Sequence, residues 1–105
     1  MTFDDLKTGE NGLIPVIVQS VSDQKVLMQA YMNRQAFEDT LRTGMMHYYS
    51  RSRASQWLKG ETSGHYQKML ELYADCDQDC LLAIVEQTGA ACHTGSYSCF
   101  FNRIV

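Results

Sequence analysis

The fold is decided by three consecutive segments, Met69-Leu70-Glu71-Leu72-Tyr73-Ala74, Asp75-Cys76-Asp77-Gln78-Asp79 and Cys80-Leu81-Leu82-Ala83-Ile84-Val85. The first part alternates apolar and polar residues, which predicts a half-buried strand. The last part is continuously apolar and predicts a central strand. If the first strand runs on into the acidic part, successive side chains there point to opposite faces. The aspartates then share one face and the cysteine points to the other.

Two different metal sites follow from this alternation. Three carboxylates on one face repel one another unless a cation lies among them, and oxygen ligands suit a hard ion such as Mg²⁺. The cysteine on the other face could join two cysteines of a loop rich in glycine and serine to hold a soft ion such as Zn²⁺. The magnesium candidates are Asp75, Asp77 and Asp79, and the zinc candidates are Cys76, Cys92 and Cys99. The alternative is that the cysteines are buried small side chains and the aspartates form a solvated turn.

The spacing of the cysteines differs from that of a structural zinc finger. Fingers and ribbons use short pairs such as C-x2-C, and this chain has none. Three cysteines without an obvious fourth ligand are typical of a catalytic site that keeps one position open for water. The fourth cysteine, Cys80, begins an apolar run, and we interpret it as core packing.

Composition predicts one ordinary globular domain over residues 1–105. Hydrophobic residues make up 45% and charged residues 20%, and the formal net charge of −3 excludes a global basic surface for nucleic acid. No apolar stretch approaches the roughly 18 residues of a membrane helix. The N-terminus is acidic, unlike a signal peptide. We therefore expect a cytoplasmic protein with reduced thiols.

The remaining patterns predict an α+β fold, a mostly antiparallel β-sheet with one principal helix. The expected elements are strands at 13–19, 26–32, 45–50, 66–74 and 80–87, a helix at 34–43, and a short last strand at 99–104. The first two strands form a hairpin, and Pro15 places the first of them at an edge or near its own start. Asn33 is a suitable N-cap and Gly44 a suitable C-terminal glycine for the helix. Residues 1–12 are expected to form a loosely held arm.

Basic residues gather in the segment between the third and fourth strands. Arg51, Arg53 and Lys59 stand there in an otherwise acidic chain, followed by hydroxyl groups and glycines. Guanidinium groups bind phosphate through two hydrogen bonds, and glycines allow backbone N–H groups to approach a ligand. The segment is either a local anion site or an ordinary solvated loop. Trp57 within it either stacks on a base or covers the edge of the core.

Four ordered motifs resemble phosphoribosyl-AMP cyclohydrolase, the enzyme family of the third step of histidine biosynthesis. They are Ser50-Arg51-Ser52-Arg53, Trp57-Leu58-Lys59-Gly60-Glu61-Thr62-Ser63-Gly64, Asp75-Cys76-Asp77-Gln78-Asp79 and Ala91-Cys92-His93-Thr94-Gly95 with Ser98-Cys99-Phe100. The resemblance covers about residues 12–101. Some relatives carry a following pyrophosphohydrolase domain, an activity we do not expect here. Cys80 departs from the small residue expected at its position.

The resemblance implies a function, cofactors and an assembly. The family hydrolyses the N1–C6 bond of N1-(5-phosphoribosyl)-AMP, and the resemblance implies a zinc-activated water as the nucleophile. By similarity, Cys76, Cys92 and Cys99 bind Zn²⁺ and the three aspartates bind Mg²⁺. The resemblance also implies an intimate homodimer in which the first of these cysteines comes from one chain and the other two from its partner.

Ring opening needs a general base and a proton donor beside the metal. His93, next to a zinc candidate, is the first candidate for one role and His65 is the second. His47, inside a predicted strand, is expected to be packed. The substrate carries two phosphates, which Arg51, Arg53 and Lys59 are expected to bind. Thr62 and Ser63 could add hydrogen bonds to the substrate.

Two other functional classes compete with this interpretation. A zinc-stabilised module without enzymatic activity would close the fourth metal position with protein, and no such ligand is evident. A metal-dependent nucleotide deaminase would carry H-x-E and P-C-x-x-C signatures, and this chain has neither. We therefore expect a hydrolase with a small-molecule substrate, without nucleic-acid or membrane partners.

Overall fold

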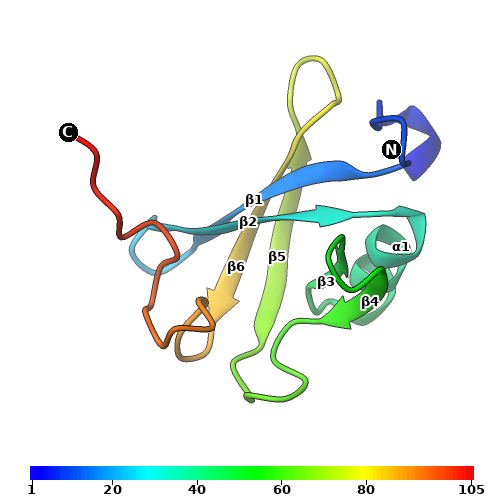
Figure 1. The fold of residues 1–105 in the computed structure, drawn as a ribbon. Helices are drawn as coiled ribbons and strands as arrows, with labels where there is room; N and C mark the ends of the chain where they lie inside the picture. Colours follow the sequence, from blue (N-terminus) through cyan, green and yellow to red (C-terminus); the bar gives the residue numbers. More distant parts are fainter.

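The computed structural model describes all residues, 1–105, and has two sheets with one α-helix. A four-stranded sheet has the order β2-β1-β6-β5, and a two-stranded sheet pairs β3 with β4. The strands are β1 (Ile14–Ser20), β2 (Val26–Met32), β3 (His47–Ser50), β4 (Ser55–Leu58), β5 (Gln67–Ala74) and β6 (Leu81–Gln87). The helix α1 spans Arg34–Thr43, and a 3-10 turn, η1, spans Phe3–Asp5. The expected α+β class is confirmed (Figure 1).

Antiparallel pairing dominates, as predicted. β1 pairs with β2 and β5 pairs with β6 in antiparallel hairpins, whereas β1 and β6 are parallel. The central position predicted for the apolar strand β6 is confirmed, since it lies between β1 and β5. Pro15 lies near the start of β1, which is itself an inner strand and not an edge.

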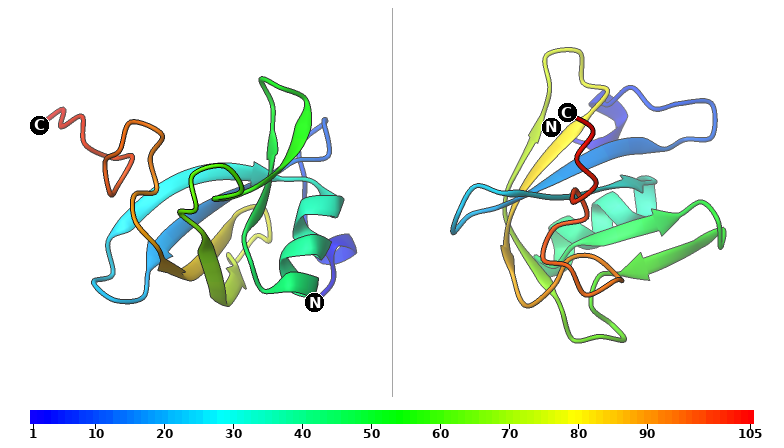
Figure 2. Two further views of the ribbon diagram at one scale, coloured as in Figure 1. Left: turned by 90° about the horizontal axis from the view of Figure 1, so that it is seen from below. Right: turned by 60° about the vertical axis from the view of Figure 1, so that its left-hand side comes forward.

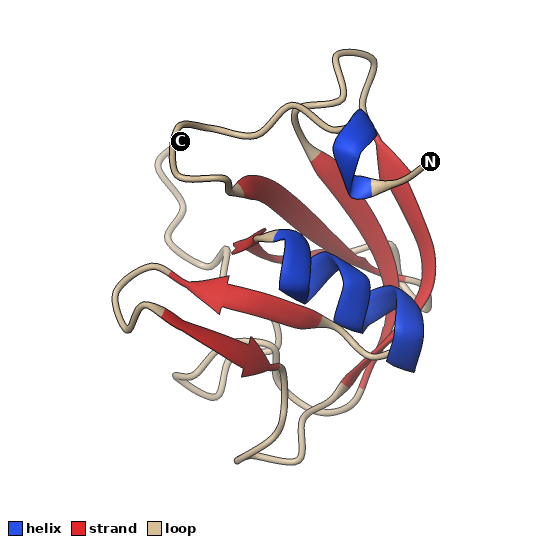
Figure 3. Ribbon diagram, turned by 90° about the vertical axis from the view of Figure 1, so that its right-hand side faces the viewer, coloured by secondary structure: helices blue, strands red, loops and turns tan.

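The helix and the small sheet cover one face of the larger sheet (Figures 2 and 3). Asn33 caps α1 as expected, because its side chain accepts a hydrogen bond of 2.9 Å from the Ala36 amide, and Gly44 ends the helix at φ 75°. Buried Tyr48 of β3 donates a hydrogen bond to Gln67 of β5 and so ties the two sheets together. The core lies between these layers. None of the helices is long and apolar enough to cross a membrane.

Four expectations about local structure were wrong. Residues 99–104 form no strand, and the segment between β3 and β5 is not one loop, because Ser55–Leu58 within it forms β4 and pairs with β3. The N-terminal arm is not loosely held, since Phe3 and Leu6 are buried in the core. The strand β5 ends at Ala74, so residues 75–80 are the turn of a hairpin and the alternation argument does not apply to the aspartates.

Candidate functional site

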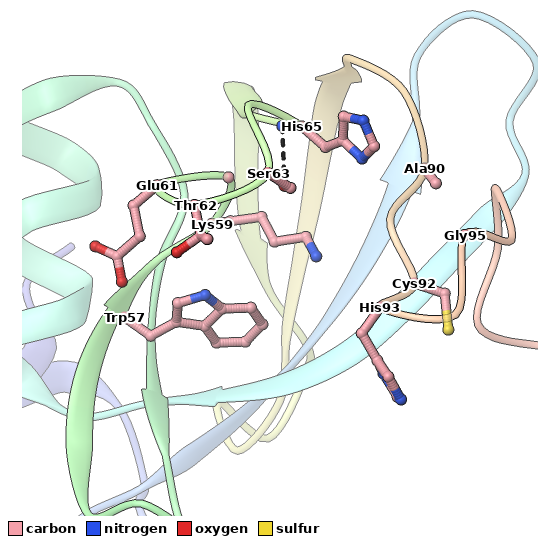
Figure 4. A pocket seen from close by; sticks show the side chains of 11 residues that line it. Trp57, Lys59, Glu61, Thr62, Ser63, His65, Ala90, Cys92, His93 and Gly95 are labelled. Carbon is pink, nitrogen blue, oxygen red and sulfur yellow. Dashed lines mark hydrogen bonds between the residues drawn. The ribbon is translucent and has the colours of Figure 1, made fainter.

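A pocket of about 300 Å³ opens between the segment after β4 and the segment after β6 (Figure 4). Six of the residues proposed from sequence line it together. They are Lys59, Thr62, Ser63, His65, Cys92 and His93. Residues about thirty positions apart in sequence therefore meet, which composition alone could not predict.

The wall formed by residues 59–65 is held by its own backbone. Gly64 donates a hydrogen bond of 2.8 Å to the Gly60 carbonyl, and Glu61 donates one of 3.1 Å to Leu58. Gly60 has φ 91°, and a Cβ there would stand 2.6 Å from the Tyr66 amide nitrogen, so only glycine fits this close approach. The Ser63 hydroxyl accepts a hydrogen bond of 3.1 Å from the His65 amide. This network orients His65 toward the pocket.

The opposite wall is a tight loop that carries the cysteines. Cys92 donates its amide to Ser96 at 3.1 Å, and Ala91 donates to Tyr97 at 3.1 Å. Cys99 lies on the return of this loop, where its amide donates a hydrogen bond of 2.7 Å to Leu27 of β2. His93 is exposed at the mouth of the pocket.

The thiols of Cys92 and Cys99 lie next to each other on this wall, and each affects the pKa of the other. The Thr94 hydroxyl donates a hydrogen bond of 3.1 Å to Cys92 Sγ and lowers the pKa of that thiol. Burial, together with the neighbouring Cys92 thiol, raises the pKa of Cys99 to about 11. The sequence analysis did not predict this role of Thr94. The signal for it was a hydroxyl residue two positions after Cys92, close enough to bond its sulfur.

Lys59 is not on a solvated loop as the basic cluster suggested. Its side chain is buried, and Nζ donates a hydrogen bond to the Ala91 carbonyl and lies 5.2 Å from the centre of the Trp57 ring. Burial lowers the pKa of Lys59, while the thiolates of Cys99 and Cys92 act in the opposite direction. Trp57 packs on Tyr48 at 5.3 Å and also lines the pocket, so it both covers the core and faces the cavity.

The predicted basic cluster is divided by β4. Arg51 and Arg53 are exposed at the tip of the β3–β4 hairpin, whereas Lys59 follows the other end of β4. The guanidinium of Arg51 lies over Tyr31 of β2, 4.0 Å from the ring centre. His47 is half-buried with Nδ1 2.8 Å from the Met45 carbonyl and lies outside the pocket lining.

The acidic stretch forms the β5–β6 turn and does not line the pocket. The Asp75 carboxylate accepts backbone hydrogen bonds from Asp79 at 3.0 Å and Cys80 at 3.3 Å. These bonds lower the pKa of Asp75, and contact with its carboxylate raises the pKa of Asp79. Asp77 lies close enough to Asp79 to raise that pKa as well. The three aspartates therefore lie in one turn, although strand alternation does not place them there. Cys80 is half-buried there and lies outside the main core cluster.

Cys76 stands far from the other two candidate zinc ligands. It is exposed in the β5–β6 turn, at the top of Figure 1, whereas the Cys92 loop follows the other end of β6 at the bottom. The seven residues of β6 span about 23 Å between these ends. No group of three His, Cys, Asp or Glu side chains within one chain is arranged to hold a metal ion. Of the three zinc candidates, only Cys92 and Cys99 therefore lie near one another within one chain.

A family model described as phosphoribosyl-AMP cyclohydrolase matches residues 28–101, which include both walls of the pocket and the acidic turn. The chain belongs to the phosphoribosyl-AMP cyclohydrolase family. This is a family of enzymes. The chain is 56% identical to the phosphoribosyl-AMP cyclohydrolase of Archaeoglobus fulgidus, over 95% of this chain and 93% of the relative. It is 58% identical to that of Streptococcus mutans, over 99% of this chain and 94% of the relative.

A longer relative extends the comparison. The chain is 51% identical to a histidine biosynthesis bifunctional protein of Halalkalibacterium halodurans, over 99% of this chain and 49% of that protein. The whole cyclohydrolase unit described here therefore matches about half of the bifunctional relative. The resemblance inferred from the four motifs is confirmed.

Proposed function

We propose that this protein hydrolyses the N1–C6 bond of N1-(5-phosphoribosyl)-AMP, the third step of histidine biosynthesis. The observation that carries this proposal is the pocket that joins both candidate histidines to Cys92 within the residues matched by the family model. Water adds to C6, the N1–C6 bond breaks, and N1 takes up a proton. His65 and His93 lie on opposite walls, so one can accept a proton from water while the other donates one to N1.

The size of the pocket suits the reacting ring better than the whole substrate. A volume of about 300 Å³ is at the lower end for ligand pockets. The purine ring therefore enters, with the Trp57 face as one wall, and the two phosphates remain outside. Thr62 and Ser63 supply hydroxyl groups at the rim, and exposed Arg51 and Arg53 supply charge for phosphate.

Zinc and magnesium complete this proposal. Cys92 and Cys99 would hold Zn²⁺ together with Cys76, and the aspartates at 75, 77 and 79 would hold Mg²⁺. Zinc supplies a water activated for attack at C6 when it is bound. Magnesium held by carboxylates suits a phosphate-bearing substrate. The chemistry of the donors supports these assignments, since the thiols of Cys92 and Cys99 follow one end of β6 and the three carboxylates precede the other.

The separation of Cys76 from its co-ligands supports a homodimer with a shared zinc site. A two-fold axis would bring the β5–β6 turn of one chain to the cysteine loop of its partner and would build two equal sites. Exposed apolar surface borders both halves of the proposed site. A hollow of about 370 Å³ beside the turn is lined mainly by apolar residues, including Ile17, Tyr73 and Leu82. Phe100, next to Cys99, is 63% exposed.

An ultraviolet assay with phosphoribosyl-AMP tests the proposed reaction, because opening the purine ring changes its absorption. Purified protein should convert the substrate, lose activity after removal of its metals by a chelator, and regain it with Zn²⁺ and Mg²⁺. Ammonia should not appear, because hydrolysis of N1–C6 releases none. Ammonia release would favour a deaminase. Unfolding on zinc removal by a protein that never opened the ring would favour a structural zinc module.

A further inference from the structure

Lys59 is the only lysine that the fold buries. Its side chain is 8% exposed, and it follows β4 directly at the floor of the pocket. None of the ion pairs in the protein involves this lysine. A buried charge without a counter-charge is costly, so its environment has to compensate it.

The compensation comes from the cysteine wall. Nζ donates a hydrogen bond to the carbonyl of Ala91, the residue immediately before Cys92. Burial lowers the pKa of Lys59, and the nearby side chains of Cys99 and Cys92 oppose this shift. The bond joins residues 32 positions apart, so it fastens the loop that follows β6 to the end of β4.

The same hydrogen bond fixes the position of the loop that carries both cysteines. The Ala91 carbonyl directly precedes Cys92, and the Ala91 amide donates a hydrogen bond of 3.1 Å to the carbonyl of Tyr97, two residues before Cys99. The ammonium group therefore anchors the loop at the point where its two strands of chain are joined. Solvated Arg51 and Arg53 cannot serve this purpose, because they stand at the tip of the hairpin.

We propose that Lys59 is a positioning residue that holds Cys92 and Cys99 in their metal-binding arrangement, and that it does not bind substrate phosphate. This inference rests on the proposed zinc site. It acts through the cysteine loop, so removing the ammonium group should weaken zinc binding and lower kcat. Substrate affinity should stay close to that of the wild type, because the phosphates bind elsewhere.

The test compares Lys59→Met with Lys59→Arg, and Arg42→Met serves as a control that removes one exposed positive charge from α1. Metal-free proteins are titrated with Zn²⁺ against a competing chelator, and kcat and KM are measured separately. Loss of groups that support metal ligands typically costs about 10–100-fold in metal affinity. We expect a loss of that size for Lys59→Met, partial recovery in Lys59→Arg and wild-type affinity in the control.

The opposite result would overturn the inference. Wild-type zinc affinity in Lys59→Met together with a raised KM would make Lys59 a phosphate ligand. If Lys59→Met fails to fold, Lys59→Gln replaces the ammonium group by an uncharged hydrogen-bond donor on a side chain one atom shorter. It should still bind zinc more weakly, and wild-type affinity there would contradict the proposal. A wild-type protein that binds zinc without opening the ring would refute the proposed function and leave the zinc titrations valid.

Discussion

The imidazole ring of His65 lies directly against the backbone of Gly89. A Cβ at Gly89 would stand 2.6 Å from Cδ2 of the ring and 2.8 Å from Nε2. His65 comes from the segment after β4, and Gly89 comes from the segment after β6. The contact between these two segments therefore fixes the position of a proposed acid–base group that lines the pocket.

Gly89→Ala should lower activity by displacing His65. A positioned acid or base contributes about 10²–10⁴-fold to a reaction, so even partial displacement should reduce kcat at least tenfold. Gly12→Ala is the matched control, since Gly12 has a similar φ of 75° but nothing within 4 Å of the added carbon. Both variants carry a backbone cost of about 1–2 kcal/mol, visible in thermal melts. Equal kcat values for the two variants would refute the role of the His65 contact.

Replacing the pocket histidines should affect chemistry more than folding. His65→Asn and His93→Asn are each expected to lower kcat by about 10²–10⁴-fold, because each would remove a proton-transfer group. His47→Asn should retain activity, since His47 lies in β3 outside the pocket lining. Steady-state kinetics on the three variants checks this. A larger loss in His47→Asn than in both others would reverse the assignment.

Elements with strong local signals could be predicted from the sequence. The bounds of α1 could be predicted from two residues. The Asn33 side chain caps the N-terminus of the helix, and the left-handed backbone of Gly44 ends it. The continuous apolar run of β6 correctly predicted a central strand. The short strand β4 could not be predicted, because Ser55–Leu58 has no clear alternation and owes its conformation to pairing with β3.

The candidate site was predictable in its members more than in its arrangement. The residue types cysteine, histidine and aspartate indicate metal-binding or acid–base chemistry by themselves, so the candidate site residues could be predicted from the sequence. The burial of Lys59 and the contact of His65 with Gly89 depend on two loops meeting in space. No local pattern encodes such a meeting. The resemblance in motifs supplied the substrate, which the fold alone does not specify.

The arginines of the β3–β4 hairpin should contribute to substrate affinity. Charge-assisted hydrogen bonds are worth about 1.5–3 kcal/mol, so Arg51→Ala or Arg53→Ala should raise KM by roughly 10–100-fold. Both side chains are exposed, and the melting temperature should change little. Arg42→Ala, which removes an exposed ion pair with Asp39, is the control. An unchanged KM in both hairpin variants would make this segment an ordinary solvated surface.

Different mutations should remove the two proposed metals independently. Cys92→Ala is expected to lose zinc and activity, because it removes one of two adjacent sulfurs. Asp77→Ala is expected to keep zinc and lose its dependence on Mg²⁺, since Asp77 lies in the β5–β6 turn, at the other end of β6 from Cys92. Metal analysis of both purified variants decides the matter. Complete zinc loss in Asp77→Ala would contradict two separate sites.

The most direct test of the shared active site is activity in a mixed dimer of Cys76→Ala and Cys92→Ala chains. Each variant alone should be inactive, since every zinc site lacks one sulfur. In a mixed dimer, one site carries both lesions and the other carries none, so activity should return to about half of the wild-type value. If all three cysteines acted within one chain, every site would keep one lesion. A verified mixed dimer without activity would therefore contradict the shared site.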